Sequence, residues 1–169
     1  RERRERRPRA GNIRTANPNA IIVHAASPIS VDDADPEGIR GKRVLCVEDG
    51  PTLTHGDMTF GAGVVLAKKF GAAEIIDPRP YTVDSITATF RKYPDIGHLL
   101  PAMGYGEKQL HDLQKTVDRV ECDAIVIGTP IDLGRLLKFK VPTTRVRYEL
   151  QEIGQPDLER AFATLMPKL

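Results

Sequence analysis

The chain has 169 residues and a formal net charge of +2, which fits one domain of roughly 100–200 residues and excludes a large multidomain protein. Hydrophobic residues make up 40% of the chain and charged residues 28%, so the chain is able to bury a hydrophobic core. The longest apolar run, residues 60–67, is far shorter than the ~20 residues that a membrane-spanning helix needs. The first residues also lack the apolar stretch of a secretory signal. We therefore expect a cytoplasmic protein with no membrane contact.

The basic charge is concentrated at the N-terminus. Residues 1–9 contain six arginines and two glutamates, whereas residues 10–169 carry a net charge of −2. Basic tails are able to grip nucleic acid, but this one has no interleaved aromatic residues and no basic stripe that continues into the rest of the chain. We interpret residues 1–11 as a charged, solvated tail, and a nucleic-acid partner is not expected.

Five short runs rich in Ile and Val alternate with amphipathic stretches, which is the pattern of a parallel sheet with helical connections. The predicted strands are residues 20–25, 43–48, 73–77, 124–128 and 143–149. The predicted helices are residues 61–71, 86–93, 106–120 and 156–166. The fold class is therefore α/β, a Rossmann-like three-layer fold with a mostly parallel sheet of about five strands.

Local signals refine these elements. Gly71 suits the left-handed position that closes a helix, and Asp84 or Ser85 is expected to cap the helix that follows. Residues 93–106 contain two prolines and three glycines, which predicts a structured loop. Residues 143–149 alternate polar and apolar side chains, which predicts an edge strand.

Polar residues gather directly after the predicted strands. In an open parallel sheet, ligands bind beyond the carboxyl ends of the strands, where the loops converge. The richest segment follows the second strand and contributes Glu48, Asp49, Gly50, Thr52, Thr54, His55 and Gly56. We take Glu48, Asp49 and His55 as candidate catalytic groups and the others as candidates for substrate binding. The alternative, in which the two acids cap and brace a tight turn, stays open.

Further candidates for substrate binding follow the other strands: Asp77, Arg79, Thr129, Asp132 and Arg147. Arg79 and Arg147 are able to clamp a phosphate, or else to pair with Asp77 and Glu149. Thr129 and Asp132 are able to contact a ligand, although capping of a short helix is the favoured interpretation.

Two more groups were considered for ligand or metal binding. The helix after Gly61 and Gly63 offers N-terminal amide donors and a partial positive charge to a phosphate or carboxylate. His55 and Asp57 are close in sequence, but a catalytic zinc site needs three protein ligands and the other three histidines are scattered. Cys46 and Cys122 form no CxxC motif. No metal site is therefore predicted.

Three long, collinear blocks carry a resemblance to a known family. They are residues 41–86, beginning GKRVLCVEDGPTLTHG, residues 93–113, YPDIGHLLPAMGYGEKQLHDL, and residues 124–154, beginning AIVIGTPIDLGRLLKFKV. The blocks resemble the C-terminal region of the predicted GTPases that are related to cyclic 2,3-diphosphoglycerate synthetase. The resemblance implies a longer parent protein in which a P-loop nucleotide-hydrolysing part precedes this region.

The resemblance also implies a division of the chain. Residues 12–38 would be a remnant of the preceding GTPase domain, and residues 39–169 would be the C-terminal α/β domain. The chain is then a fragment that binds a small anionic substrate, phosphorylated or carboxylate, and lacks nucleotide hydrolysis by itself. No cofactor is expected in this chain, whereas GTP or ATP with Mg²⁺ is implied for the parent. The expected partners are the missing N-terminal GTPase portion and a second copy in a homo-oligomer.

A second hypothesis makes the region a non-catalytic assembly or regulatory module of the parent GTPase. Whether the chain is itself an enzyme therefore stays open at this point. Substitution of Asp49 or His55 distinguishes the two hypotheses, because loss of activity with unchanged assembly favours a site.

Overall fold

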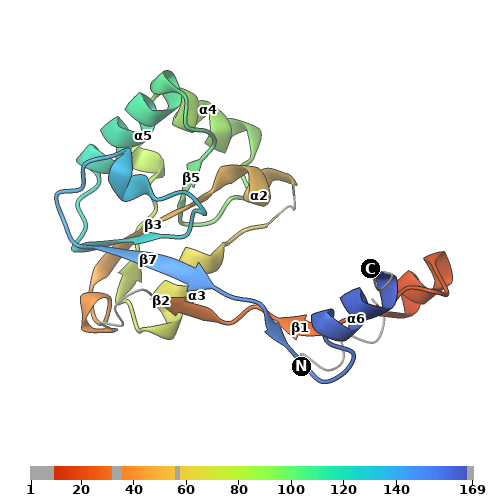
Figure 1. Ribbon diagram of the computed structural model, residues 1–169. Helices are drawn as coiled ribbons and strands as arrows, with labels where there is room; N and C mark the ends of the chain where they lie inside the picture. Colours follow the sequence, from red (N-terminus) through yellow and green to blue (C-terminus); the bar gives the residue numbers. More distant parts are fainter. Residues whose placement is uncertain (1–9, 32–35, 56–57, 167–169) are drawn as a thin grey trace. The chain divides into compact units, whose positions relative to one another are not determined.

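The computed structural model describes residues 10–31, 36–55 and 58–166 (Figure 1). Contacts between residues divide the chain into two compact units. The larger unit is Ile29–Tyr148, and the smaller unit combines the residues before it with those after it, Arg1–Pro28 and Glu149–Leu169. The domain boundaries predicted after residues 11 and 38 are not tested by this division and stay predictions. Each unit is described by itself below.

The larger unit is built on a six-stranded sheet with the order β2-β7-β6-β3-β4, in which β5 pairs with β3 as well. The strands are β2 (Ile29–Val31), β3 (Arg43–Asp49), β4 (Glu74–Ile75), β5 (Leu100–Ala102), β6 (Ala124–Ile127) and β7 (Thr143–Tyr148). Only β2 runs antiparallel to its neighbour among the described strands of this sheet. The predicted class, α/β and Rossmann-like with a mostly parallel sheet, is confirmed.

Strand β3 is the centre of the sheet. Along one side it pairs with β6 over Val44–Val47. Along the other side it pairs first with β4, at Arg43 and Val44, and then with β5, from Val47 to Asp49. All four residues Val44–Val47 are fully buried, as are those of β6, because both faces of these strands are covered.

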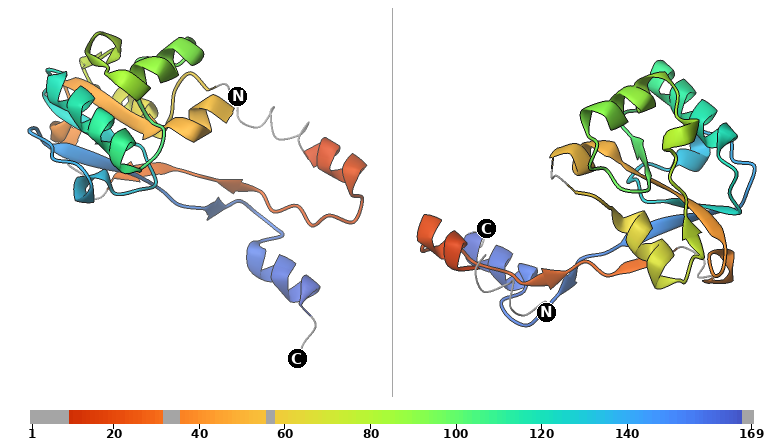
Figure 2. Two further views of the ribbon diagram at one scale, coloured as in Figure 1. Left: turned by 90° about the horizontal axis from the view of Figure 1, so that it is seen from above. Right: turned by 180° about the vertical axis from the view of Figure 1, so that it is seen from behind.

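Helices cover both faces of this sheet (Figures 1 and 2). Helix α3 (Ala62–Lys69) lies on one face, and α4 (Asp84–Lys92) and α5 (Glu107–Arg119) lie together on the other. The short helix α2 (Gly50–His55) follows β3 without a loop, and three 3-10 turns, Pro36–Gly38, Arg79–Tyr81 and Leu133–Arg135, complete the unit. Within the described ranges, no helix is both long enough and apolar enough to cross a membrane.

Two helix ends show how local sequence and tertiary contacts compete. Gly71 has φ of 76° just beyond α3, as its lack of a Cβ predicts. The predicted cap of α4 by Asp84 or Ser85 is wrong, since the capping residue is Val83 and makes no side-chain bond there. The buried carboxylate of Asp112 on α5 instead accepts hydrogen bonds from the Ser85 backbone N–H at 3.2 Å and the Ser85 hydroxyl at 2.5 Å.

Three expectations about strands are wrong. Strand β7 is not an edge strand, because β2 pairs along its outer side. Residues 93–106 contain β5, whose three buried residues include Pro101. Of the predicted strand 20–25, only Ala25 lies in a strand, because β1 (Ala25–Ala26) finds just two partners.

The smaller unit consists of a short ribbon and helices. Strand β1 pairs antiparallel with β8 (Gln151–Glu152), and α6 (Leu158–Leu165) follows. Residues 10–16 are helical as well. Among the described residues of this unit, Ala161 is the only buried one. Those of its residues whose exposure the structure describes therefore form no hydrophobic core of their own.

Candidate functional site

The strand order creates one topological switch point in the larger unit. From β3 the chain passes through α2 and α3 to β4 on one side, and from β5 it returns through α5 to β6 on the other side of β3. In open α/β sheets the crevice beyond the carboxyl ends of two such strands is the usual place for a ligand. Here those ends carry Glu48 and Asp49 on β3 and Gly128 and Thr129 after β6.

The carboxylate of Glu48 is enclosed at this switch point, with only 2% of the residue exposed. Its Oε1 accepts a 2.9 Å hydrogen bond from the backbone N–H of Val64 in the first turn of α3. Three glycines surround it: a Cβ at Gly61 or Gly128 would overlap the carboxylate, and one at Gly63 would lie 3.0 Å from Oε1. The helix amides predicted to be free for an anionic ligand are therefore used by the protein's own Glu48.

Burial raises the pKa of Glu48 to about 7, well above its ordinary value. The backbone N–H groups of Val64 and Gly63 oppose this rise, and the neighbouring Asp49 charge adds to it. A carboxyl group with a pKa near neutrality is able to take up and release a proton at physiological pH.

Asp49 braces the start of α2. Its Oδ2 accepts hydrogen bonds from the Thr52 hydroxyl at 2.5 Å and the Thr52 backbone N–H at 3.2 Å. This supports the capping interpretation that the sequence left open. The carboxylate is nevertheless only half-buried, and no lysine or arginine of the described ranges forms an ion pair with it.

A cavity of about 230 Å³ opens beside these two carboxylates. The residues that line it come from the ends of β3 and β6, from α2, from the start of α3 and from β7: Glu48, Asp49, Thr52, Leu53, Met58, Gly61, Ala62, Gly128, Pro130 and Tyr148. The lining residues within the described part of the chain include two acids and no lysine, arginine or histidine. The cavity is therefore acidic.

Thr129 and Tyr105 lie next to this cavity rather than on its lining. Thr129 is buried, and its hydroxyl donates a 2.7 Å hydrogen bond to the Ile131 carbonyl. The Tyr105 hydroxyl is also buried. Burial raises the pKa of Tyr105, the Asp49 charge raises it further and the nearby Thr129 hydroxyl lowers it.

Asp132 has the capping role that the sequence favoured. Its Oδ1 accepts a 3.1 Å hydrogen bond from the Gly134 N–H in the turn Leu133–Arg135. The Arg145 guanidinium lies 3.6 Å from Asp132 Oδ2 and donates a 2.6 Å hydrogen bond to the Pro130 carbonyl. Arg145 therefore holds the loop that forms one wall of the cavity.

Several other candidates lie elsewhere. Arg79 pairs with Asp77 at 2.9 Å, donates to the Ile96 carbonyl and stacks 4.7 Å from the Phe90 ring centroid, so its guanidinium is committed to structure. Arg147 is exposed on β7, opposite Ser30. The remaining candidates of the 50–56 segment are not on the cavity lining, and Gly56 lies outside the described residues.

Within that segment the structure gives each placed residue a local role. Gly50 is buried where a Cβ would lie 2.9 Å from the Ala102 carbonyl, so it permits close packing of α2 on β5. The Thr54 hydroxyl donates to the Pro51 carbonyl at 3.2 Å. His55 is exposed at the end of α2.

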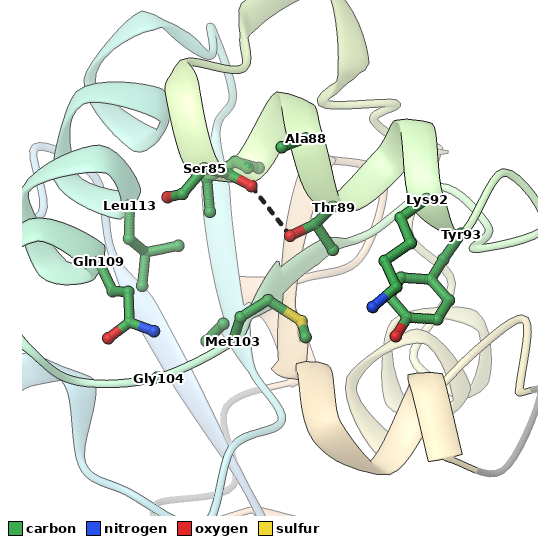
Figure 3. A pocket seen from close by; sticks show the side chains of 11 residues that line it. Ser85, Ala88, Thr89, Lys92, Tyr93, Met103, Gly104, Gln109 and Leu113 are labelled. Carbon is green, nitrogen blue, oxygen red and sulfur yellow. Dashed lines mark hydrogen bonds between the residues drawn. The ribbon is translucent and has the colours of Figure 1, made fainter.

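A second cavity, of about 290 Å³, lies between α4, α5 and the residues that follow β5 (Figure 3). Its labelled polar side chains are Ser85, Thr89, Lys92, Tyr93 and Gln109, none of which the sequence predicted to bind a ligand. The Thr89 hydroxyl donates a 2.9 Å hydrogen bond to the Ser85 carbonyl. The residues described around it include no carboxylate, so its lining gives less support to catalysis than the switch point does.

Sequence reasoning missed Tyr105, Met58 and Tyr148 near the switch point. Gly128 carried a usable signal, because a glycine directly after a fully buried strand often marks close approach by another group. Tyr105 carried none, since β5 was not recognised and the residues after it were treated as one loop.

Part of a named protein is similar in sequence to this chain. The chain is 60% identical over 151 residues to the arginine synthetase ArcE of Thermococcus kodakarensis. The match covers 89% of this chain and 33% of that protein, so the chain spans about a third of the relative's length. No protein-family model and no solved structure matches the chain.

This likeness overturns the family assigned from the sequence blocks. A relationship to GTPases of the cyclic 2,3-diphosphoglycerate synthetase type is not supported, because a relative at 60% identity is an arginine synthetase. The inferred function, a GTPase-associated domain for a phosphorylated or carboxylate substrate, is wrong for the same reason. The alternative, a regulatory module of such a GTPase, gains no support either.

Proposed function

We propose that this chain is one part of an arginine-forming enzyme and that the switch-point cavity holds the basic end of arginine or of its precursor. The identity of 60% over most of the chain supports the reaction class. The acidic cavity supports the location that we assign to the reaction. The single observation that carries the proposal is the coincidence of that cavity with the switch point of the sheet.

The charge of the cavity favours a cationic group over an anion. A guanidinium group presents five N–H donors in a planar fork that matches a carboxylate. The half-buried carboxylate of Asp49 lines the cavity and lacks an ion-pair partner among the described residues. A ligand guanidinium or amino group would supply that partner.

The size of the cavity favours a small ligand. Its volume of about 230 Å³ lies below the range of about 300–1,000 Å³ that is usual for pockets holding drug-sized molecules. A single amino acid is of the appropriate size class. The GTP or ATP implied for the parent protein therefore requires a different site and stays a prediction, as does a homo-oligomer.

Glu48 is assigned proton transfer in this proposal. A route that builds the guanidinium of arginine forms a carbon–nitrogen bond and breaks the bond from the same carbon to a leaving group, and the incoming nitrogen loses a proton in this exchange. With a pKa of about 7, the Glu48 carboxyl is suited to accept this proton and to return it. Its place on the cavity lining gives it access to a bound ligand.

The test is a chimera in which this chain replaces the matching third of the Thermococcus arginine synthetase. The chimera is expected to form arginine, measured by mass spectrometry. Asp49→Asn should abolish most of this activity and weaken arginine binding at least about tenfold, which corresponds to about 1.4 kcal/mol. Asparagine caps a helix as well as aspartate does, so the start of α2 should be retained while the charge is lost.

Asp118→Asn is the matched control. Asp118 is an exposed acid of α5 that pairs with Lys140 at 3.1 Å, far along the sequence from the switch point. Its substitution should leave arginine formation unchanged. A chimera that forms arginine equally well with Asn at position 49 would refute the role of the cavity.

A further inference from the structure

We infer that the apolar side chains of the smaller unit form a docking surface for the remaining two thirds of an arginine synthetase. The surface consists of Ile13, Ile21, Leu150, Ile153, Leu158, Phe162 and Met166, all of which are exposed. The inference rests on the likeness to the arginine synthetase and not on the chemistry proposed for the cavity.

Exposed apolar side chains are concentrated in this unit. Seven of the thirteen large hydrophobic residues that are exposed in the described chain belong to it, although it holds only about a quarter of the described residues. Scattered exposed hydrophobic residues are ordinary on protein surfaces, but a concentration of this kind marks an interaction site.

Few interactions within the smaller unit are able to stabilise it in isolation. Its ribbon pairs two residues with two, and a two-stranded ribbon is at best marginally stable in water. Ala161 is its one buried residue in the described ranges. A unit without a core needs a partner to bury its apolar side chains.

Hydrogen bonds from nearby side chains stabilise the N-terminus of helix α6, whereas the apolar side chains on one of its faces are exposed. Asp157 Oδ1 accepts a 2.8 Å hydrogen bond from the Arg160 N–H, and Glu152 Oε1 accepts a 2.7 Å hydrogen bond from the Leu158 N–H. These two carboxylates satisfy amides that a helix N-terminus leaves free. The hydrogen bonds that cap this helix therefore come from this chain and do not require a partner.

The apolar residues of α6 and its end have the spacing of a docking helix. Leu158, Phe162 and Met166 follow each other at intervals of four residues, so they lie along one side. They are 36%, 56% and 63% exposed. A stripe of this kind fits an apolar groove on another protein surface.

The size of the relative identifies the occupant. The larger unit spans residues 29–148, so a match over 151 residues must extend into the smaller unit. The relative therefore shares sequence with this unit and has two thirds of its length beyond the match. That remainder belongs to the relative, and its counterpart is the occupant we assign.

Hydrogen exchange of the α6 amides tests the inference in the chimera and in this chain alone. Protection of residues 158–165 should rise at least about tenfold in the chimera, because burial suppresses local opening. Phe162→Asp should abolish that gain and leave the exchange of β3 unchanged. Val65→Asp, at an exposed apolar position of α3, is the matched control and should preserve the gain.

Three outcomes would overturn the inference. Equal exchange of α6 in the chimera and in the chain alone would show that the remainder does not cover the helix. Equal effects of the Phe162 and Val65 substitutions would show that the surface is not specific. Dimerisation of the chain alone, abolished by Phe162→Asp in sedimentation, would assign the surface to a second copy. All three readouts are independent of arginine formation, so they separate this inference from the proposed function.

Discussion

The backbone N–H of Val64 donates a 2.9 Å hydrogen bond to the side chain of Glu48, sixteen residues earlier in the chain. This bond joins the carboxyl end of β3 to the first turn of α3. Because Glu48 also lines the cavity, the same carboxylate both caps a helix and faces the ligand space. Its protonation therefore affects the stability of the fold.

Glu48→Gln should change how stability depends on pH. The pKa is about 7 in the folded protein and 4.5 ordinarily, so between these pH values the folded state keeps a proton that the unfolded state has lost. Wild-type stability should therefore fall as pH rises through this window, by about 3 kcal/mol at about 1.4 kcal/mol per pKa unit. The Gln variant cannot lose this proton and should gain by that amount relative to wild type.

Urea unfolding at intervals from pH 5 to pH 8 measures this difference. Asp118→Asn is the control, because the pair that Asp118 forms with Lys140 is at the surface. The difference between Glu48→Gln and wild type should grow from pH 5 to about pH 7 and level off above it. Stability curves that run parallel for the two proteins would contradict the raised pKa.

Gly128→Ala should destabilise the protein because its Cβ would overlap the Glu48 carboxylate. We expect a loss of about 1–3 kcal/mol in the free energy of unfolding, the usual cost of overpacking. Gly38→Ala is the matched control, since the nearest atom to its Cβ, the Thr144 hydroxyl oxygen, is 3.8 Å away. That control should stay close to wild type.

Combining the substitutions isolates the cause. In a Glu48→Ala background the carboxylate is gone, so Gly128→Ala should cost markedly less than it does in wild type. An identical cost in the two backgrounds would mean that the cost comes from the Gly63 backbone N, which would lie 2.9 Å from the same Cβ, and not from the Glu48 carboxylate.

Asp112→Ala should loosen the packing of α4 on α5. The Ser85 hydroxyl and the Lys108 ammonium lower the pKa of Asp112 to about 2, and the substitution leaves Ser85 without its acceptor. We expect a loss of about 1–3 kcal/mol near neutral pH, because the partly buried Ser85 loses its hydrogen-bond acceptor. This contribution is present above the ordinary pKa of 3.8 and should disappear as pH falls through about 2.

Thermal unfolding of Asp112→Ala and Asp118→Ala provides the comparison on a single helix. Both residues are acids of α5, but the Asp118 pair is exposed and should contribute less than about 1 kcal/mol. Equal melting temperatures for the two variants would contradict a stabilising role for the hydrogen bonds between Ser85 of α4 and Asp112 of α5.

The centre of the fold was predictable from sequence because its strands are buried on both faces. Runs such as Val44–Val47 and Ala124–Ile127 have no polar residue, and α5 carries Leu113 and Val117 on its buried side. Strand β5 was missed because it has three residues, and one of them is Pro101. Short strands are defined by their neighbours, which a sequence pattern does not contain.

The site was only partly predictable, for a related reason. Glu48, Asp49 and Thr52 line the cavity because they lie at or just beyond the carboxyl end of a strand that was predicted correctly. The role of Asp77 and Arg79 depends on a third segment, since Arg79 also binds the Ile96 carbonyl. The reaction class was wrong because one fold supports many reactions, and local chemistry does not name the substrate.

Along one edge, strand β3 pairs with two different strands, one for each of its halves. Its first residues depend on β4, whereas Val47–Asp49 depend on the three residues of β5. Any motion that shifts β5 would therefore reposition the two acids without disturbing the opposite end of the strand. Glu48 and Asp49 therefore lie on the half of the central strand whose position depends on β5.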